Sequence, residues 1–252
     1  MKKGKVTGMP SLWVQRPIVI PFCQGCQHGS IGRLICENVE EMGLDDRAIL
    51  VGGVGCHAVI SFMVDFDSVQ TAHGRPPDVA SAIKRVLPGE PIVMTVQGDG
   101  DALSIGTEPL IQAAARAEKI TVIVANNGCY GTTGGQMAPT TLIGQKTTTT
   151  PEGRNAIHGF PIRAAELLAG LQGVAYSARG TVSTPANYQR TKKYIKAALQ
   201  KQVDGVGFSF VEIITACPPN WHLSPLECLR WIDEKVVQQF PLGEFKNVDS
   251  LE

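Results

Sequence analysis

Short apolar runs alternate with amphipathic stretches along this chain. The runs at 49–51, 92–96, 120–124 and 206–214 have the length and β-branched content of buried strands, and 171–176 leads into another strand. Ala-rich or helically spaced apolar positions predict helices at 30–42, 79–86, 108–118, 161–170, 188–200 and 225–235. This alternation predicts the α/β fold class, with a doubly wound, mostly parallel sheet. We expect a single domain over 1–252, with an N-terminal extended arm at about 1–20, where three prolines discourage a helix.

Two polar loops directly follow two of the predicted strands. The first is Gly98-Asp99-Gly100-Asp101, and the second begins at Asn126-Asn127. Because the helix at 108–118 makes their strands parallel, both loops should emerge at the carboxyl edge of the sheet, where such folds bind ligands. A carboxylate and a carboxamide suit Mg²⁺ held together with a diphosphate. The alternative is a plain turn and a helix cap, but the two loops in combination favour a ligand site.

Seven cysteines are spread along the chain. Cys23 and Cys26 form a C-x-x-C pair before the helix at 30–42, which fits a metal site, an iron–sulfur cluster or a redox pair. Cys56 and His57 follow a glycine-rich loop after the strand at 49–51, and Cys217 follows the strand at 206–214. Spacing alone leaves zinc and iron–sulfur open, because both accept thiolates.

Two further segments are polar and rich in turn residues. His73 lies in a turn before the helix at 79–86, where it is either solvated or hydrogen-bonded to a cofactor. The segment 130–151 holds many glycines and threonines, so we expect a long ordered loop or lid instead of core structure.

Charge and composition narrow the range of functions. The chain has 23 basic and 23 acidic residues, so its net charge is zero and nothing indicates nucleic acid or a membrane surface as a partner. No apolar run reaches transmembrane length, and no signal-peptide core follows the basic start. We therefore expect a cytoplasmic location.

These motifs together resemble the thiamine-diphosphate-binding β subunit of the 2-oxoacid:ferredoxin oxidoreductases, whose domain has the pyrophosphate-binding (PP-type) thiamine fold. The matching motifs are Cys23-x-x-Cys26-x-His28-Gly29, Gly55-Cys56, Ala72-His73-Gly74-Arg75, Gly98-Asp99-Gly100-Asp101, Asn126-Asn127, Thr133-Gly134-Gly135-Gln136, Pro139-Thr140-Thr141 and Cys217-Pro218. The segments 134–141, 217–221 and 240–243 look like the branched-chain (2-oxoisovalerate) branch. Gln24 and Gln27 depart from the family, which commonly has proline and glycine there, and this puts the local turn geometry in question.

The resemblance implies a set of site residues. Asp99 and Asn127 would bind Mg²⁺ by side chain, and Cys129 by its main-chain oxygen. The diphosphate would be bordered by Gly98, Gly100, Asp101, Gly131 and Thr132, and the rest of the cofactor by Val54, Gly55, Cys56, His57 and His73. A [4Fe-4S] cluster would be bound by Cys23, Cys26, Cys56 and Cys217. His28 and His73 are the candidate catalytic residues, whereas Cys36 and Cys228 are expected to be packing residues in helices.

The implied activity is the CoA-dependent oxidative decarboxylation of a 2-oxoacid, with 2-oxoisovalerate as the expected substrate. The products would be acyl-CoA and CO₂, and electrons would pass through [4Fe-4S] to ferredoxin. The alternatives are the same chemistry on 2-oxoglutarate or pyruvate, a non-oxidative thiamine-dependent decarboxylase subunit, or a non-catalytic subunit with zinc in place of the cluster.

The resemblance also implies partner subunits. The sequence has no second domain to supply the glutamate that activates thiamine, and no ferredoxin-like C-x-x-C-x-x-C-x-x-x-C-P run. We therefore expect a pyrimidine-binding α subunit and a ferredoxin-like γ subunit, and no activity from this chain alone.

Overall fold

The core of the protein is a seven-stranded sheet. The computed structural model describes residues 8–14 and 22–251. The strand order is β2-β1-β3-β4-β8-β7-β9, in which only β9 runs antiparallel to its neighbour. The strands are β1 Ala48–Gly52, β2 Asp67–Gln70, β3 Ile92–Gly98, β4 Thr121–Asn126, β7 Val174–Thr181, β8 Phe208–Ile214 and β9 Gly243–Asn247, and a separate hairpin pairs β5 Cys129–Tyr130 with β6 Gln136–Met137. The predicted mostly parallel sheet is confirmed.

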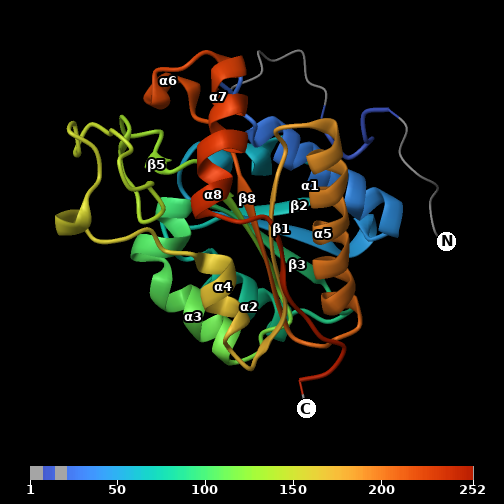
Figure 1. Ribbon diagram of the computed structural model, residues 1–252. Helices are drawn as coiled ribbons and strands as arrows, with labels where there is room; N and C mark the ends of the chain where they lie inside the picture. Colours follow the sequence, from blue (N-terminus) through green and yellow to red (C-terminus); the bar gives the residue numbers. More distant parts are fainter. Residues whose placement is uncertain (1–7, 15–21, 252) are drawn as a thin grey trace.

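Helices cover both faces of the sheet, as Figure 1 shows. One face packs on α1 (His28–Met42) and α5 (Pro185–Val203), and the other on α2 (Pro76–Val86), α3 (Thr107–Ala115) and α4 (Ala164–Ala169). Each interface has its own buried apolar cluster, because the strands are apolar on both sides. A third cluster lies under α6 (Pro218–Trp221), α7 (Pro225–Trp231) and α8 (Val237–Gln239). Within the described ranges, no helix is long and apolar enough to cross a membrane.

Several local elements differ from the prediction. The strands β2 and β9 were not predicted, because β2 is exposed along its whole length and neither strand has an apolar run. The 3-10 helices η1 (Asp45–Arg47), η2 (Cys56–Phe62) and η4 (Ala156–His158) and the π-helical turns η3 (Asp101–Ile105) and η5 (Ile232–Val236) were also missed. The helix expected at 161–170 is limited to α4, because residues 161–163 are not helical.

The predicted N-terminal arm is only partly described. Residues 1–7 and 15–20 lie outside the described residues. Of the remainder, Leu12 is buried in the first apolar cluster, and Trp13 forms a β-bridge with Val64. This described part of the segment therefore packs on the domain.

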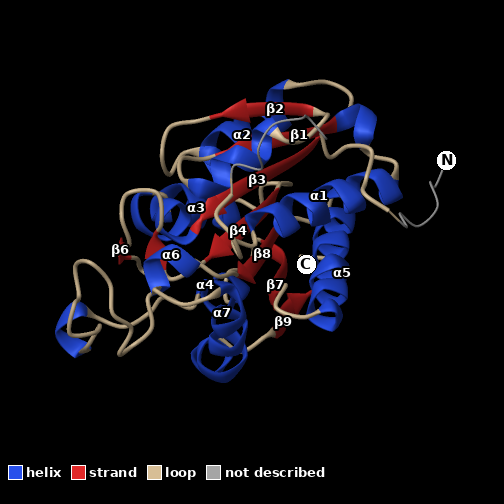
Figure 2. Cartoon of the chain, turned by 90° about the horizontal axis from the view of Figure 1, so that it is seen from above, coloured by secondary structure: helices blue, strands red, loops and turns tan. Residues whose placement is uncertain are grey.

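The carboxyl ends of neighbouring strands meet at one edge of the sheet. In the parallel register, the ends of β1, β3 and β4 lie side by side, and β8 continues the row. Figure 2 looks onto the molecule from above and shows the loops and the β5–β6 hairpin gathered beside these strands. The glycine-rich and polar loops of the sequence therefore share one edge, as predicted.

Candidate functional site

A cavity of about 200 Å³ lies at the carboxyl edge of the sheet. Its walls come from the loops that follow β1, β2, β3 and β4, and from the start of α1. The lining residues are His28, Val54, Gly55, Cys56, His57, His73, Gly98, Asp99, Gly100, Asp101, Asn127, Cys129, Tyr130, Gly131, Thr132 and Thr133. Every residue predicted to contact the cofactor is in this set, as is His28. The structure thus brings them together, while their individual roles remain predictions.

Asp99 is a buried carboxylate at the floor of the cavity. Its Oδ1 accepts the N–H of Gly100 at 2.8 Å, and its Oδ2 accepts the N–H of Gly128 at 2.8 Å and the hydroxyl of Thr140. None of these donors carries a positive charge. Burial raises the pKa of Asp99 to about 7, although the three hydrogen bonds act in the opposite direction. A divalent cation beside this group would favour its ionised form, so the residue suits a metal site.

Asn127 follows β4 and lies in the turn that faces Asp99. Its Oδ1 accepts the N–H of Cys129 at 3.1 Å, and its main-chain oxygen accepts the indole N–H of Trp221 at 2.9 Å. Both ends of the residue are therefore fixed by neighbours, and the residue lines the cavity. A carboxylate, an amide and main-chain oxygens form the type of donor set that Mg²⁺ prefers.

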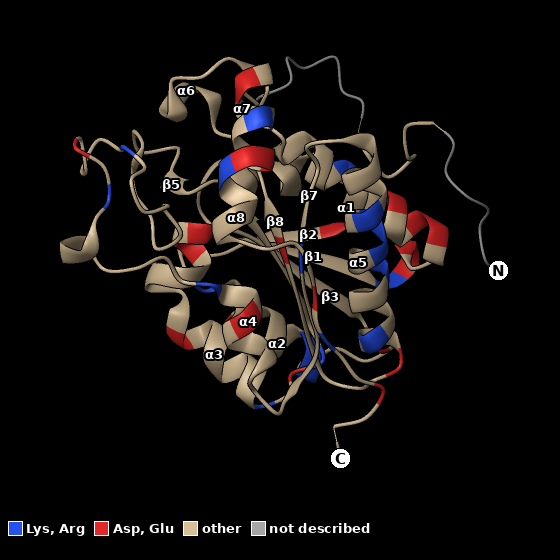
Figure 3. Ribbon diagram, viewed as in Figure 1, with Lys and Arg blue, Asp and Glu red and all other residues tan. Residues whose placement is uncertain are grey.

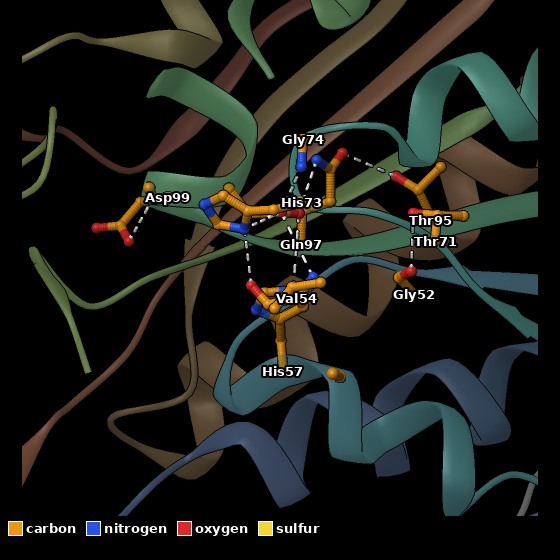
Figure 4. A network of polar contacts seen from close by, with 12 residues as sticks. Gly52, Val54, His57, Thr71, His73, Gly74, Thr95, Gln97 and Asp99 are labelled. Atoms are coloured by element: carbon orange, nitrogen blue, oxygen red, sulfur yellow. Dashed lines mark hydrogen bonds and ion pairs between the residues drawn. The ribbon is translucent and has the colours of Figure 1, made fainter. Parts of the chain in front are cut away.

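His73 and Asp101 form a hydrogen-bonded pair in the wall of the cavity, and Figure 4 shows His73 among its neighbours. The Nδ1 of His73 lies 2.7 Å from Asp101 Oδ1 and 3.1 Å from the main-chain oxygen of Val54. Because both partners are acceptors, Nδ1 carries the proton. Asp101 is itself held by the N–H of Gly74 at 2.7 Å and the amide of Gln97 at 2.9 Å. Among the described residues the Nε2 of His73 has no hydrogen-bond partner, and it lies on the side on which Asp99 lies (Figure 4).

His57 carries an unpaired polar atom in the wall of the cavity. The side chain is buried, and its Nε2 has no hydrogen-bond partner among the residues that the structure describes. The nearest acid, Asp101, is 3.7 Å away. Burial, with smaller contributions from His28 and His73, lowers the pKa of His57 to about 3, so the imidazole is neutral. A buried, unpaired nitrogen is costly unless a partner satisfies it.

Cys56 and Cys217 meet at Gly131. A Cβ atom on Gly131 would lie 3.4 Å from the sulfur of Cys56 and 3.5 Å from that of Cys217. Because Gly131 has no side chain, space remains between these two thiols. They are 161 residues apart in the sequence. Hydrogen bonds from the Cys129 thiol and from Asn220 lower the pKa of Cys217 to about 6, against the effect of burial. Cys217 is therefore prepared to act as a thiolate ligand.

Cys23 and Cys26 lie beside the same group of thiols. Burial raises the pKa of Cys26 to about 12, and charges on Cys217, Cys56 and Cys23 add to the shift. The loops that carry Cys26, Cys56 and Cys217 lie close together, because Gln27 bonds to Ala216 and the sulfurs of Cys56 and Cys217 both lie beside the position of Gly131. Across residues 8–14 and 22–251, however, no three Cys, His, Asp or Glu side chains gather closely enough to bind a single metal ion. A compact one-ion zinc site is thus not preformed.

The structure explains one departure from the family pattern. Gln27 is buried, and its Oε1 accepts the main-chain N–H of Ala216 at 3.0 Å. This bond ties the loop of Cys26 to the loop of Cys217. The next residue, His28, is buried with its Nδ1 2.9 Å from the sulfur of Cys26.

Several contributors were missed in the sequence. Tyr130 and Thr133 line the cavity, Thr140 bonds to Asp99, and Gln97 bonds to Asp101. The thiol of Cys129, which the resemblance does not implicate, donates to Asn127 Oδ1 at 3.6 Å and contributes to the lowered pKa of Cys217. Thr133 and Thr140 lie in the matching motifs at 133–136 and 139–141, and Tyr130 follows shortly after Asn127, so these motifs were the available signal. Gln97 lies in the apolar strand before Gly98 and has no such signal. The packing prediction for Cys36 and Cys228 is consistent with their complete burial.

The raised pKa of Asp99 predicts a pH dependence for the metal-free protein. Its folded pKa of about 7 lies above the ordinary value of 3.8, so its contribution to stability is complete below 3.8 and is lost as the pH rises through about 7. Mg²⁺ needs the ionised carboxylate, so its affinity should fall about tenfold per pH unit below 7. Mg²⁺ titration and denaturant unfolding over this range would check both trends, with Asp99→Asn as the control that lacks the titration. Identical pH dependence in the two proteins would contradict the assignment.

Comparison with known proteins bears directly on this arrangement. A family profile described as "Thiamine pyrophosphate enzyme, C-terminal TPP binding domain" matches residues 53–213. The ketoisovalerate oxidoreductase subunit VorA of Methanothermobacter marburgensis is 40% identical over 93% of this chain and 49% of its own length. The 2-oxoglutarate synthase subunit KorB of Archaeoglobus fulgidus is 35% identical over 90% of this chain and 77% of its own.

A solved structure of 2-oxoglutarate:ferredoxin oxidoreductase from Magnetococcus marinus shares the fold, with a TM-score of 0.77 and 23% identity over 96% of this chain and 86% of the other. The chain spans about half the length of the VorA proteins that it matches.

Proposed function

The chain belongs to the 2-oxoacid:ferredoxin oxidoreductase family of thiamine pyrophosphate enzymes, and we propose that it is the subunit that binds thiamine diphosphate, Mg²⁺ and one [4Fe-4S] cluster. One observation carries this proposal. The cavity with Asp99 and Asn127 on its floor has Cys56 in its wall, and the sulfurs of Cys56 and Cys217 flank Gly131 in that wall. The cofactor that supports decarboxylation of the substrate and the acceptor that takes up its electrons would thus be neighbours.

The proposed thiamine site uses the residues of the cavity. Asp99 and Asn127 would bind Mg²⁺ by side chain and Cys129 by its main-chain oxygen. The unpaired Nε2 of His57 and the pKa of Asp99, raised by burial, support a polar, cation-bearing ligand here. When bound, thiamine diphosphate supplies a nucleophilic carbon and an electron sink for decarboxylation. The chain's own residues would orient that cofactor and exclude water from it.

The proposed cluster site uses Cys23, Cys26, Cys56 and Cys217. A [4Fe-4S] cluster is larger than one ion, accepts four thiolates and supplies one-electron transfer. The space at Gly131 and the lowered pKa of Cys217 support this reading. The zinc alternative would place the same thiolates around a single ion, and iron and sulfide analysis distinguishes the two.

The two candidate catalytic histidines are assigned different roles. His73 has a protonated Nδ1 held by Asp101 and a free Nε2, so we propose that it exchanges a proton with the bound substrate. His28 is buried against Cys26, so we propose that it orients this thiol and takes no part in proton transfer.

The proposed substrate is 2-oxoisovalerate. The 40% identity to VorA proteins supports it, although KorB relatives at 35% leave 2-oxoglutarate as the second candidate. Coenzyme A would take up the acyl group, and ferredoxin would receive the electrons. The proposed partners are a pyrimidine-binding α subunit and a ferredoxin-like γ subunit.

The complex co-expressed with these partners tests the proposal. Assayed anaerobically with a viologen dye, it should reduce the dye only when CoA and a 2-oxoacid are both present, and fastest with 2-oxoisovalerate among 2-oxoisovalerate, 2-oxoglutarate and pyruvate. Release of CO₂ without dye reduction would instead identify a non-oxidative decarboxylase. No reaction with any of the three acids would contradict the proposal.

A further inference from the structure

Two fully buried charged residues lie inside the sheet. Arg179 on β7 and Glu212 on β8 are directly opposite each other in the parallel register, and both have an exposed fraction of 0%. The Nε of Arg179 donates to Glu212 Oε2 at 2.7 Å. Figure 3 shows such charged positions on the strands between the layers of helices, apart from those on the helix surfaces.

The guanidinium of Arg179 also has partners on the side away from Glu212. It donates to both carboxylate oxygens of Glu166 on α4 and to the main-chain oxygen of Pro241, and it lies 5.1 Å from the ring centres of Phe240 and Phe245. Apolar residues of similar volume usually stabilise a protein as well as a buried ion pair does, or better. Fold stability alone is therefore a weak explanation for placing two charges here.

The second carboxylate oxygen of Glu212 begins a chain of hydrogen bonds that ends at the proposed Mg²⁺ ligand Asp99. Glu212 Oε1 accepts the side-chain N–H of Asn126 at 2.7 Å, and Asn126 Oδ1 accepts the N–H of Gly128 at 3.1 Å. The same N–H of Gly128 donates to Asp99 Oδ2 at 2.8 Å. An unbroken chain of hydrogen bonds thus joins the buried ion pair to the carboxylate that is proposed to bind Mg²⁺.

The charge of Glu212 determines which way the Asn126 amide points. An ionised carboxylate accepts hydrogen bonds and cannot donate them, so it requires the NH₂ group of Asn126 on its side. The amide oxygen must then face Gly128, which fixes the turn that carries Asn127 and Cys129. Arg179 in turn neutralises the charge of Glu212, which would otherwise act more strongly on nearby Asp99.

We propose that the Arg179–Glu212 ion pair is a positioning element of the Mg²⁺ site, acting through Asn126 and Gly128. The inference rests on the proposed function, because it assumes that Mg²⁺ binds at Asp99 and Asn127. Neither charged residue contacts the cavity, so their role is to set the geometry of the residues that do. Partners beyond the direct ligands commonly control metal affinity in this way.

The substitution Glu212→Gln in the co-expressed complex tests the inference. A glutamine has an oxygen at only one of the two positions and an NH₂ group at the other, so it cannot accept from Asn126 and Arg179 as the two carboxylate oxygens do, and the amide of Asn126 loses its fixed orientation. We expect the Mg²⁺ concentration needed for half-maximal thiamine diphosphate binding to rise about tenfold, with binding restored at saturating Mg²⁺. The measurement is a Mg²⁺ titration of the chelator-treated complex, with retained thiamine determined after gel filtration.

Glu166→Gln is the matched control. It makes the same chemical change on the same guanidinium, on the side away from Asn126. A purely structural network predicts that both variants lower the unfolding temperature and affect Mg²⁺ equally. The proposal predicts wild-type Mg²⁺ affinity in Glu166→Gln and weakened affinity in Glu212→Gln.

Two outcomes would overturn the inference: wild-type Mg²⁺ affinity in Glu212→Gln, or equal weakening in both variants. If Glu212→Gln does not fold, Asn126→Ala breaks the next link, and wild-type affinity there overturns it as well. If thiamine binding by the wild-type complex does not depend on Mg²⁺, the proposed function fails first, so the two failures are distinguishable.

Discussion

Replacing Asp99 with alanine is expected to weaken Mg²⁺-dependent binding of thiamine diphosphate at least about a hundredfold, because the change removes the only carboxylate among the proposed Mg²⁺ ligands. The side chain is buried and also holds the turn at Gly128 and the hydroxyl of Thr140, so no neighbouring group takes its place. Thiamine retained by the complex at increasing Mg²⁺ concentrations would measure the effect. The iron content should stay at the wild-type level, since the cysteines do not contact this carboxylate directly.

Asp78→Ala is the control for this substitution. Asp78 lies in the first turn of α2, half-exposed and paired only loosely with Arg75 at 3.4 Å, away from the cavity lining. The Asp78→Ala complex should bind thiamine diphosphate as the wild type does. Wild-type cofactor affinity in Asp99→Ala would remove Asp99 from the site.

The second large effect is expected for Cys217→Ser. Serine is a poor ligand for iron, and Cys217 is the proposed ligand whose pKa is lowered toward the thiolate form. The complex should lose about four iron atoms per copy of this chain, together with all oxoacid-dependent dye reduction. Iron and sulfide analysis measures the loss against the wild type, so that clusters in partner subunits cancel in the difference.

Cys228→Ser is the matched control for that loss. Cys228 is fully buried on the inner side of α7 and donates weakly to the main-chain oxygen of Leu223 at 3.9 Å. This variant should keep its iron even if it is less stable. Equal iron loss in the two variants would mean that Cys217 acts through folding, and full iron in Cys217→Ser would exclude it as a ligand.

The parts of the site that could be predicted are local in sequence. The loops with Asp99, Asn127 and Cys56 directly follow apolar runs, and parallel strands bring the ends of such runs to one edge. The order of strands and helices and the lining of the cavity therefore follow from short segments of sequence, with the family resemblance adding the ligand roles.

The parts that could not be predicted depend on contacts distant in sequence. Nothing around Glu212 indicates that it faces Asn126, because register across β4 and β8 is set only when the sheet forms. In the sequence, Gln27 is only a departure from the family pattern, and its hydrogen bond with Ala216 is evident only from the structure. The edge strand β2 has no apolar pattern, because all of its residues are exposed.

The central claim is that the thiamine site and its electron acceptor share this chain. The most direct measurement is electron paramagnetic resonance of the complex, mixed anaerobically with 2-oxoisovalerate and CoA and with no external acceptor. We predict the signal of a reduced [4Fe-4S] cluster in the wild type, loss of the part assigned to this chain in Cys217→Ser, and no reduction in Asp99→Ala. An unreduced cluster in the wild type, or a spectrum that Cys217→Ser leaves unchanged, would contradict the account.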